Sequence, residues 1–213
     1  MNPHDLKQIF DFSLLSNKMK YIERFKGHYF WREYPEPARY DSNADHSWHL
    51  AMLVLLFSDK LSKPFNAEKG LKIALLHDMV EIYAGDTDPL GSEGTGADTH
   101  AFNKTAEGEK TKKEEAAAQK IFATLSQEKQ KEFYELWQEY ATGSSFEALV
   151  VKALDKIEAT MQVIEWRDGE VFPEHLQFSI KYLHKYADVD PAIKEFTNLI
   201  TEELKKRYKG FSV

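Results

Sequence analysis

The segment from residue 73 to residue 83, Ile-Ala-Leu-Leu-His-Asp-Met-Val-Glu-Ile-Tyr, combines a helical apolar pattern with a histidine and an aspartate side by side. Its apolar side chains recur at the three- and four-residue spacing of a buried helix face. His77 and Asp78 interrupt this face, and burial of an imidazole beside a carboxylate is costly unless another group compensates their polar atoms. A divalent cation would provide that compensation.

The rest of the chain has the same helical periodicity. No segment shows the sustained alternation of a half-buried strand, so we expect an all-α helical bundle with short links. Asn66 and Ser126 precede expected helices and are typical N-cap residues. The stretches 27–45 and 85–104 break the pattern and are expected to be loops. The expected helices cover residues 3–25, 46–62, 66–84, 105–124, 127–141, 145–167 and 173–208, the last broken near Pro191.

Composition limits the class of protein. The 213 residues include 28 basic and 35 acidic side chains, a net charge of −7, eight histidines and no cysteine. The lack of cysteine excludes disulfides, thiolate metal sites and cysteine nucleophiles, so any metal must bind histidine and carboxylate. The excess of acidic over basic side chains disfavours binding to polymeric nucleic acid, but a locally cationic pocket can still bind a small anion. The length is that of one domain, expected to cover residues 1–213.

The chain lacks the features of a membrane or secreted protein. No run of about 18 apolar residues is present, as a spanning helix would need. The N-terminal residues Met-Asn-Pro-His-Asp-Leu-Lys lack the basic start and apolar core of a signal peptide. We therefore expect a cytoplasmic protein with no membrane partner.

Two further segments place possible metal ligands beside apolar helix faces. Asp45-His46-Ser47 lies at the start of one expected helix, and Asp155 interrupts the apolar run of another. Together with the histidine and aspartate of the first segment, these side chains could bind one ion, although spacing alone does not establish it. Asp155 could instead form a surface ion pair with Lys152 or Lys156.

The order of these residues resembles the H…HD…D signature of HD-domain metal-dependent phosphohydrolases. The sequence segments around these residues are similar to those of the 5′-deoxynucleotidase branch, the YfbR-like and HD-domain-containing-protein-2-like enzymes. These segments are 44–47 (Ala-Asp-His-Ser), 74–86 and 151–155 (Val-Lys-Ala-Leu-Asp). The resemblance covers about residues 10–165. It implies an HD-domain helical bundle with that core, and a C-terminal helical extension over about residues 170–213 has no recognised counterpart.

The resemblance implies a metal site of known composition. His46, His77, Asp78 and Asp155 match the four metal ligands of the family. Two imidazoles and two carboxylates suit one divalent Mn, Co, Fe or Ni ion better than Mg²⁺, which prefers oxygen ligands.

The resemblance also implies roles around the metal. Glu81, expected on the same helix face as the His-Asp pair, matches the catalytic glutamate, and Asp86 matches the second acid of an E-x-x-x-x-D word. One of them activates the attacking water, and which one remains open. Arg24 and Phe25 match an arginine and aromatic pair that contacts phosphate and nucleoside, although the bacterial enzymes have tryptophan in the second place and a shorter segment before the first histidine. His49 is expected to pack or to support a ligand.

The expected activity is hydrolysis of a phosphomonoester, a (deoxy)nucleoside 5′-monophosphate, to nucleoside and phosphate. The resemblance also implies a homodimer. A phosphodiesterase or a nucleoside triphosphohydrolase on the same scaffold is an alternative, and so is a metal- or nucleotide-binding regulatory module without turnover. Lys110, Lys112 and Lys113 are interpreted as a solvated helix face and not as a polyphosphate clamp.

Overall fold

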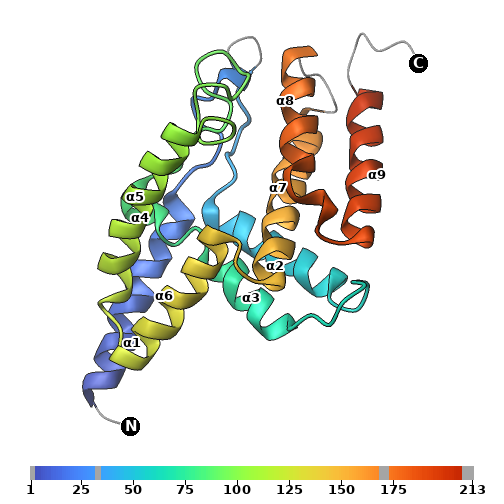
Figure 1. Ribbon diagram of the computed structural model, residues 1–213. Helices are drawn as coiled ribbons and strands as arrows, with labels where there is room; N and C mark the ends of the chain where they lie inside the picture. The colour runs from blue at the N-terminus through green and yellow to red at the C-terminus, as the bar shows by residue number, and fades with distance from the viewer. Residues whose placement is uncertain (1–2, 32–34, 168–172, 208–213) are drawn as a thin grey trace.

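The computed structural model describes residues 3–31, 35–167 and 173–207, and within them the chain is helical without any strand. This confirms the expected all-α class. No helix of these ranges combines the length and the apolar character that crossing a bilayer requires. The elements are α1 (Pro3–Ser16), η1 (Asn17–Tyr21), η2 (Tyr29–Trp31), α2 (Asn43–Phe57), α3 (Ala67–Leu76), α4 (Glu81–Ala84), α5 (Lys104–Phe122), α6 (Gln127–Thr142), α7 (Phe146–Arg167), α8 (Pro173–Leu183), η3 (His184–Val189) and α9 (Pro191–Arg207), as Figure 1 shows.

Helices α2, α3 and α7 form the centre of the bundle. Each of the three contacts the other two. On one side α8, η3 and α9 pack against α7, and on the other side α5 and α6 pair with each other (Figure 1). Three segments that are far apart in the sequence therefore meet at the middle of the molecule.

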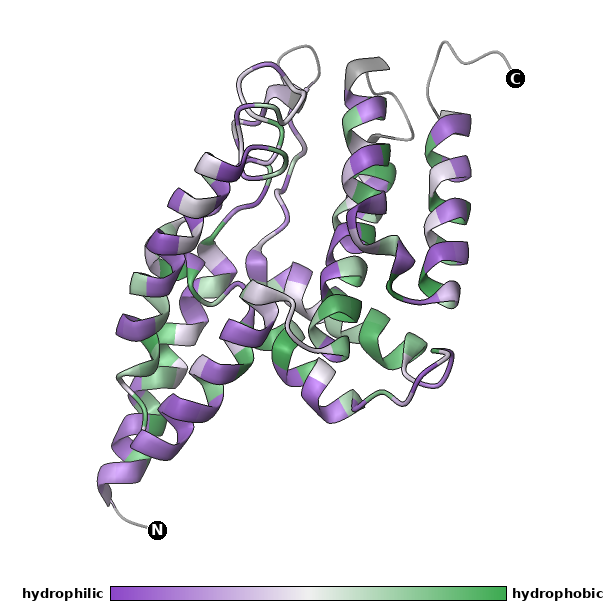
Figure 2. Ribbon diagram, in the orientation of Figure 1, coloured by the Kyte–Doolittle hydropathy of each residue, from purple (hydrophilic) through white to green (hydrophobic). Residues whose placement is uncertain are grey.

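The apolar core surrounds this centre. Its fully buried side chains include Leu50, Ile73, Phe122 and Leu154, from α2, α3, α5 and α7. Figure 2 shows hydrophobic residues concentrated where α2, α3 and α7 come together. Each such side chain contributes about 1.5–3 kcal/mol when fully buried, so the central helices provide a rigid frame for polar groups.

The helix expected over residues 66–84 is divided in two. It begins after Asn66, whose side chain accepts a hydrogen bond from Lys69 N as expected of an N-cap, but α3 ends at Leu76 and α4 begins at Glu81. In between, the Glu81 amide donates to the carbonyl of Asp78 at 3.0 Å, a three-residue turn. Glu81 therefore does not continue the helix of the His-Asp pair, and the expectation of one shared helix face is wrong.

The helix expected over residues 3–25 also ends early, at Ser16, and η1 follows it. Residues 22–24 then run beside the segment that leads into α2. The Arg24 amide donates to the Asp41 carbonyl at 2.8 Å, and the Asn43 amide donates to the Ile22 carbonyl at 3.0 Å. These bonds place Arg24 next to the start of α2, in a loop and not on a helix.

The remaining expected elements agree with the structure more closely. Ser126 caps α6 by accepting from the Lys129 amide, and residues 85–103 form the expected loop. The break near Pro191 is present, because α9 begins at that residue, but α8 and η3 divide the preceding segment further. Residues 32–34 of the first expected loop, and 170–172 and 208–213 of the expected extension, lie outside the described residues.

Candidate active site

Two buried histidines point their Nε2 atoms at each other. His46, in the first turn of α2, and His77, just after α3, have Nε2 atoms 3.2 Å apart. The Nδ1 atom of His77 lies 2.9 Å from the carbonyl oxygen of Ala74, which can only accept, so that nitrogen carries the proton. The Nε2 lone pair of His77 is thereby left free at the point where the rings meet.

Two carboxylates complete the cluster. Asp155 on α7 has Oδ1 3.3 Å from Nε2 of His46, and Asp78 has Oδ2 3.1 Å from Nε2 of His77 and 3.6 Å from Nε2 of His46. One donor atom from each of His46, His77 and Asp155 lies within 4.8 Å of the others. The structure thus brings together the four residues that the sequence suggests as metal ligands.

Groups behind the cluster fix its orientation. Glu158 on α7 is buried and accepts a hydrogen bond from Nδ1 of His46, and its other oxygen lies 3.1 Å from Nδ1 of His49. The other oxygen of Asp155 accepts from the Tyr140 hydroxyl and from Lys156 Nζ, both at 2.7 Å. His49 therefore contacts the group that orients His46, as expected of a residue that supports a ligand. Asp155 forms the ion pair with Lys156 through one oxygen and still contacts His46 through the other.

The electrostatics of the cluster favour positive charge at its centre. Burial opposes a proton on His46 and Arg24 repels it, but Glu158 and Asp155 outweigh both and raise the pKa of His46 to about 10. Burial also opposes ionisation of Asp155, yet Lys156 and His46 hold its pKa well below the usual range. Because buried anions attract a cation here, and because the donors are two imidazoles and two carboxylates, the residues fit a divalent metal ion.

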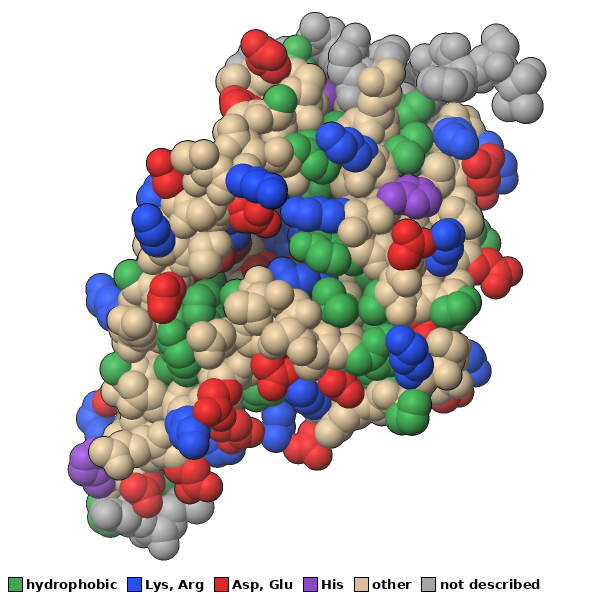
Figure 3. Space-filling view, viewed as in Figure 1, with side chains coloured by type: hydrophobic (Ala, Val, Ile, Leu, Met, Phe, Trp, Pro, Cys, Tyr) green, Lys and Arg blue, Asp and Glu red, His purple; other side chains and the backbone are tan. Residues whose placement is uncertain are grey.

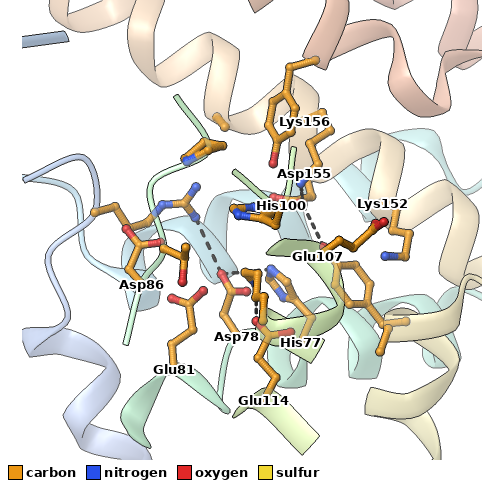
Figure 4. Close-up of a pocket in the computed structure, with 18 of the residues that line it drawn as sticks. His77, Asp78, Glu81, Asp86, His100, Glu107, Glu114, Lys152, Asp155 and Lys156 are labelled. Carbon is orange, nitrogen blue, oxygen red and sulfur yellow. Dashed lines mark hydrogen bonds and ion pairs between the residues drawn. The ribbon is translucent and has the colours of Figure 1, made fainter. Parts of the chain in front are cut away.

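The two expected catalytic acids lie beside this cluster. Glu81 is buried at the start of α4, and its Oε2 accepts a hydrogen bond from Asn43 Nδ2 at 2.5 Å. Burial, with Asp78 and Asp86 nearby, raises the pKa of Glu81 well above its ordinary value. Asp86 follows Gly85, where the backbone has φ +78°, and its side chain is exposed at the same pocket. Figure 4 shows Asp78, Glu81 and Asp86 on one side of the pocket.

Arg24 and Phe25 line the same pocket. The Arg24 guanidinium lies 3.8 Å from Asp78 Oδ2 and 3.9 Å from Asp41 Oδ2, and its Nη1 has no hydrogen-bond partner among the described residues. Burial opposes its charge, but Glu158 and Asp78 raise its pKa. Phe25 has φ +62°, a strained conformation for a bulky residue, and Trp31 Nε1 donates to its carbonyl at 2.6 Å.

The pocket also contains residues that sequence reasoning missed. Lys110 on α5 lines it and pairs with Glu114, so the interpretation of Lys110 as part of a solvated face is wrong, whereas Lys112 and Lys113 are exposed. His100, from the loop before α5, lies near the centre of the pocket in Figure 4. A further set of lining residues comes from α6, α7, α8 and η3: Tyr140, Lys152, Lys156, Tyr182, Lys185 and Tyr186.

Comparison with known proteins identifies the family. The model of the HD domain family matches residues 30–197, further toward the C-terminus than the resemblance seen in the sequence. The 5′-deoxynucleotidase HDDC2 of Bos taurus is 33% identical over 83% of this chain and 77% of its own length, and the protein of that name from Homo sapiens is 32% identical over 82% and 76%.

Solved structures agree with this fold. A predicted metal-dependent phosphohydrolase from Magnetospirillum magnetotacticum MS-1 superposes with a TM-score of 0.69 at 21% identity, covering 96% of this chain and 97% of that one. An HD-domain phosphohydrolase from Listeria innocua gives a TM-score of 0.70 at 16% identity, covering 93% and 90%. With a family match over most of its length and relatives at one-third identity, this chain belongs to the HD-domain family of metal-dependent phosphohydrolases.

Proposed function

We propose that this enzyme hydrolyses the 5′-phosphate of a (deoxy)nucleoside monophosphate and releases nucleoside and phosphate. The observation that carries the proposal is the convergence of two imidazoles and two carboxylates beside Arg24 in one pocket. The relatives named 5′-deoxynucleotidase support a nucleotide as the substrate.

In this proposal His46, His77, Asp78 and Asp155 hold one divalent ion. The mixed nitrogen and oxygen donors favour Mn²⁺, Co²⁺, Fe²⁺ or Ni²⁺ over Mg²⁺. When bound, the ion supplies Lewis-acid stabilisation of negative charge on the phosphate. The two carboxylates balance its charge, so a phosphate dianion needs a further cation from the protein.

Arg24 provides that cation. Its raised pKa keeps the guanidinium charged, and its Nη1 donors have no hydrogen-bond partner among the described residues, so they are available to phosphate oxygens. Phe25, beside it at the pocket wall, is placed to contact the sugar or the base.

The two acids carry the protons. Water attacks phosphorus in line with the ribose O5′ atom, the P–O5′ bond breaks, and the oxygen of water becomes part of the released phosphate. We assign Glu81 to accept the proton of the attacking water, because it is buried next to the metal ligands and held by Asn43. Asp86, exposed at the pocket, passes a proton from solvent water to the departing O5′.

A phosphate-release assay tests the activity. Chelated and dialysed protein is supplied with Mn²⁺, Co²⁺, Fe²⁺, Ni²⁺ or Mg²⁺ and with a panel of nucleoside 5′- and 3′-monophosphates. We expect release from 5′-monophosphates, fastest with one of the first four ions. No phosphate release from any nucleotide with any ion would leave a regulatory binding module as the better description.

Two variants test the assignment of roles. Glu81→Gln removes the proton acceptor but no ligand, so it should bind metal normally and lose about 100-fold or more in turnover. Asp78→Asn removes a metal ligand, so this variant should lose both metal binding and turnover. Native turnover by Glu81→Gln would show that another group activates the water.

The expected homodimer and cytoplasmic location are part of the proposal, as is a single domain over residues 1–213. An exposed apolar face on α2 supports the dimer. The C-terminal extension is proposed to belong to the same domain, because η3 packs against α7 and contributes Lys185 to the pocket. Sedimentation equilibrium measures whether the protein is a dimer, and cell fractionation measures whether it is cytoplasmic.

A further inference from the structure

Four lysine side chains line the pocket. Lys152 and Lys156 come from α7 and Lys185 from η3, whereas Lys110 comes from α5, where Glu81 and Asp78 are among the charges that raise its pKa. In Figure 4, Lys152 and Lys156 lie across the pocket from Glu81 and Asp86. Figure 3 shows Lys and Arg side chains around a hollow on this face of the molecule. In this protein of net charge −7 the pocket lining thus contains cationic side chains together with those of six acidic residues: Asp78, Glu81, Asp86, Glu107, Glu114 and Asp155.

Three of these lysines have acidic partners. Lys156 donates to Asp155 at 2.7 Å, and Lys110 pairs with Glu114 one turn later on α5. The third is Lys185 on η3, whose Nζ lies 3.8 Å from Glu107 Oε1 and donates to the carbonyl of Ala101 at 3.3 Å. Their charges are therefore already partly balanced by the protein.

Lys152 differs from the other three. Throughout the part of the chain that the structure describes, no carboxylate lies within ion-pair distance of its ammonium group. Its Nζ lies 4.5 Å from the ring centroid of Tyr140 and 5.5 Å from that of Tyr186. Burial and the charge of Lys156 lower the pKa of Lys152 to about 8, and only Asp155 opposes them appreciably. A half-buried cation beside other cations and without an ion-pair partner is costly to the fold, which is characteristic of a site that binds an anion.

A second polar group in the pocket also lacks a hydrogen-bond partner among the described residues. The Nδ1 atom of His100 is buried and has no hydrogen-bond partner within the described ranges. Burial and three of the lysines lower the pKa of His100 to about 3, so the ring is neutral and can donate or accept one hydrogen bond at each nitrogen. The carbonyl of Ala101, the residue after His100, accepts a hydrogen bond from Lys185 Nζ. This bond keeps the His100 and Lys185 side chains on the same wall of the pocket.

Lys152 is also set apart from the metal ligands. The Tyr140 ring lies 4.8 Å from the ring of His77, and its hydroxyl bonds to Asp155, so this ring occupies the space next to the ligand cluster. Lys152 contacts the same ring through its ammonium group. A phosphate held by Arg24 and the metal ligands is therefore not the natural partner of Lys152, which can instead reach another group of the same bound molecule.

We propose that Lys152, together with Lys185 and His100, forms a second anion subsite that binds a phosphate of the substrate other than the one hydrolysed. The substrate class is then a nucleoside 5′-phosphate with a second phosphate on the sugar, as in a nucleoside 3′,5′-bisphosphate, because cleavage of the P–O5′ bond of a nucleoside diphosphate would release diphosphate and not phosphate. This inference rests on the proposed function for the identity of the phosphate that is hydrolysed, but the subsite itself can be measured without turnover.

Calorimetry on chelated full-length protein tests the subsite, because no hydrolysis takes place and the metal does not contribute. AMP, ADP and adenosine 3′,5′-bisphosphate are titrated into the native protein and into Lys152→Gln. We expect the bisphosphate to bind at least about tenfold more tightly than AMP, since the second phosphate gains a charge-assisted contact. A gain in affinity for ADP alone would overturn the assignment of the second phosphate to the sugar.

The variants separate a subsite from a structural role. Lys152→Gln should remove the preference and leave AMP affinity unchanged, whereas Lys152→Arg, which keeps the charge, should retain it. Lys120→Gln is the matched control, because Lys120 lies over the ring of Tyr83 at 3.8 Å but does not line the pocket. It should behave as the native protein.

Two results would overturn the subsite. One is equal affinity of the native protein for all three nucleotides. The other is a loss in Lys152→Gln that is the same for AMP as for the doubly phosphorylated ligands. A preference that depends on Lys152 in a protein that releases no phosphate from any monophosphate would refute the proposed function and leave the subsite standing.

Discussion

At the scale of single residues, the ligand cluster depends on a group that belongs to no recognised motif. Glu158 is only 1% exposed and contacts Nδ1 of both His46 and His49. A carboxylate at Nδ1 fixes the ring and its tautomer, and so presents Nε2 to a metal. The sequence shows Glu158 three residues after Asp155, on the same helix face, but not that His46, 112 residues earlier, lies opposite it.

Removal of this carboxylate should weaken metal binding. Glu158→Gln keeps the shape but loses the charge that orients His46, and outer groups of this kind are typically worth about 10–100-fold in metal affinity. Calorimetric titration of chelated protein with Mn²⁺ measures the change. Glu165→Gln, an exposed acid on the same helix, is the control and should bind as the native protein does. Native Mn²⁺ affinity in Glu158→Gln would mean that this hydrogen bond does not organise the site.

The four expected ligand residues can be predicted from the sequence, because each is a polar side chain in an otherwise apolar stretch and the motifs around them are short. Lys110 cannot be distinguished from Lys112 or Lys113 by sequence, because all three lie in one charged helix and only tertiary packing turns the first toward the pocket.

At the scale of elements, the turn between α3 and α4 and the end of α4 place the catalytic acids. The sequence predicts the beginnings of α3 and α6, since an N-cap bond spans only three residues. It does not reveal the break after Leu76, because Met79 and Val80 are buried whether or not the helix continues. Gly85 ends α4 at φ +78° and ψ 153°, a conformation that only glycine adopts readily.

Substitution of this glycine should therefore disturb the site through the backbone alone. A Cβ at Gly85 meets no atom within 4 Å, so Gly85→Ala should cost about 1–3 kcal/mol of stability from strain and should also lower phosphate release by moving Asp86. Gly108→Ala, likewise unobstructed but inside α5, should instead stabilise the protein by about 0.5–1 kcal/mol. Urea unfolding measures both, and equal effects of the two substitutions would refute the role assigned to the turn.

Across the molecule, exposed apolar side chains lie on α1, at Leu6, Ile9, Phe10 and Leu14, and on one face of α2. Trp48 and Leu56 of α2 are 66% and 62% exposed, and Met52 and Leu55 continue the same face at helical spacing. A face of this kind is where we expect the second copy of the proposed homodimer to pack.

Charge placed on this face should separate the copies. Trp48→Glu combined with Leu56→Glu is expected to halve the molar mass measured by sedimentation equilibrium, while the fold is kept because both side chains are exposed. Leu199→Glu, on an exposed position of α9, is the control and should leave the mass unchanged. A native protein with the mass of one chain would contradict the dimer directly.

In the proposed active site His46, His77, Asp78 and Asp155 hold one divalent metal ion. Titration of chelated protein with Mn²⁺ in a calorimeter, with the native protein compared with Asp155→Asn, measures this binding. We predict one Mn²⁺ ion bound per chain in the native protein and no measurable binding in Asp155→Asn, whose fold is verified by circular dichroism. Binding of no ion by the native protein, or equal binding by the folded variant, would contradict the claim.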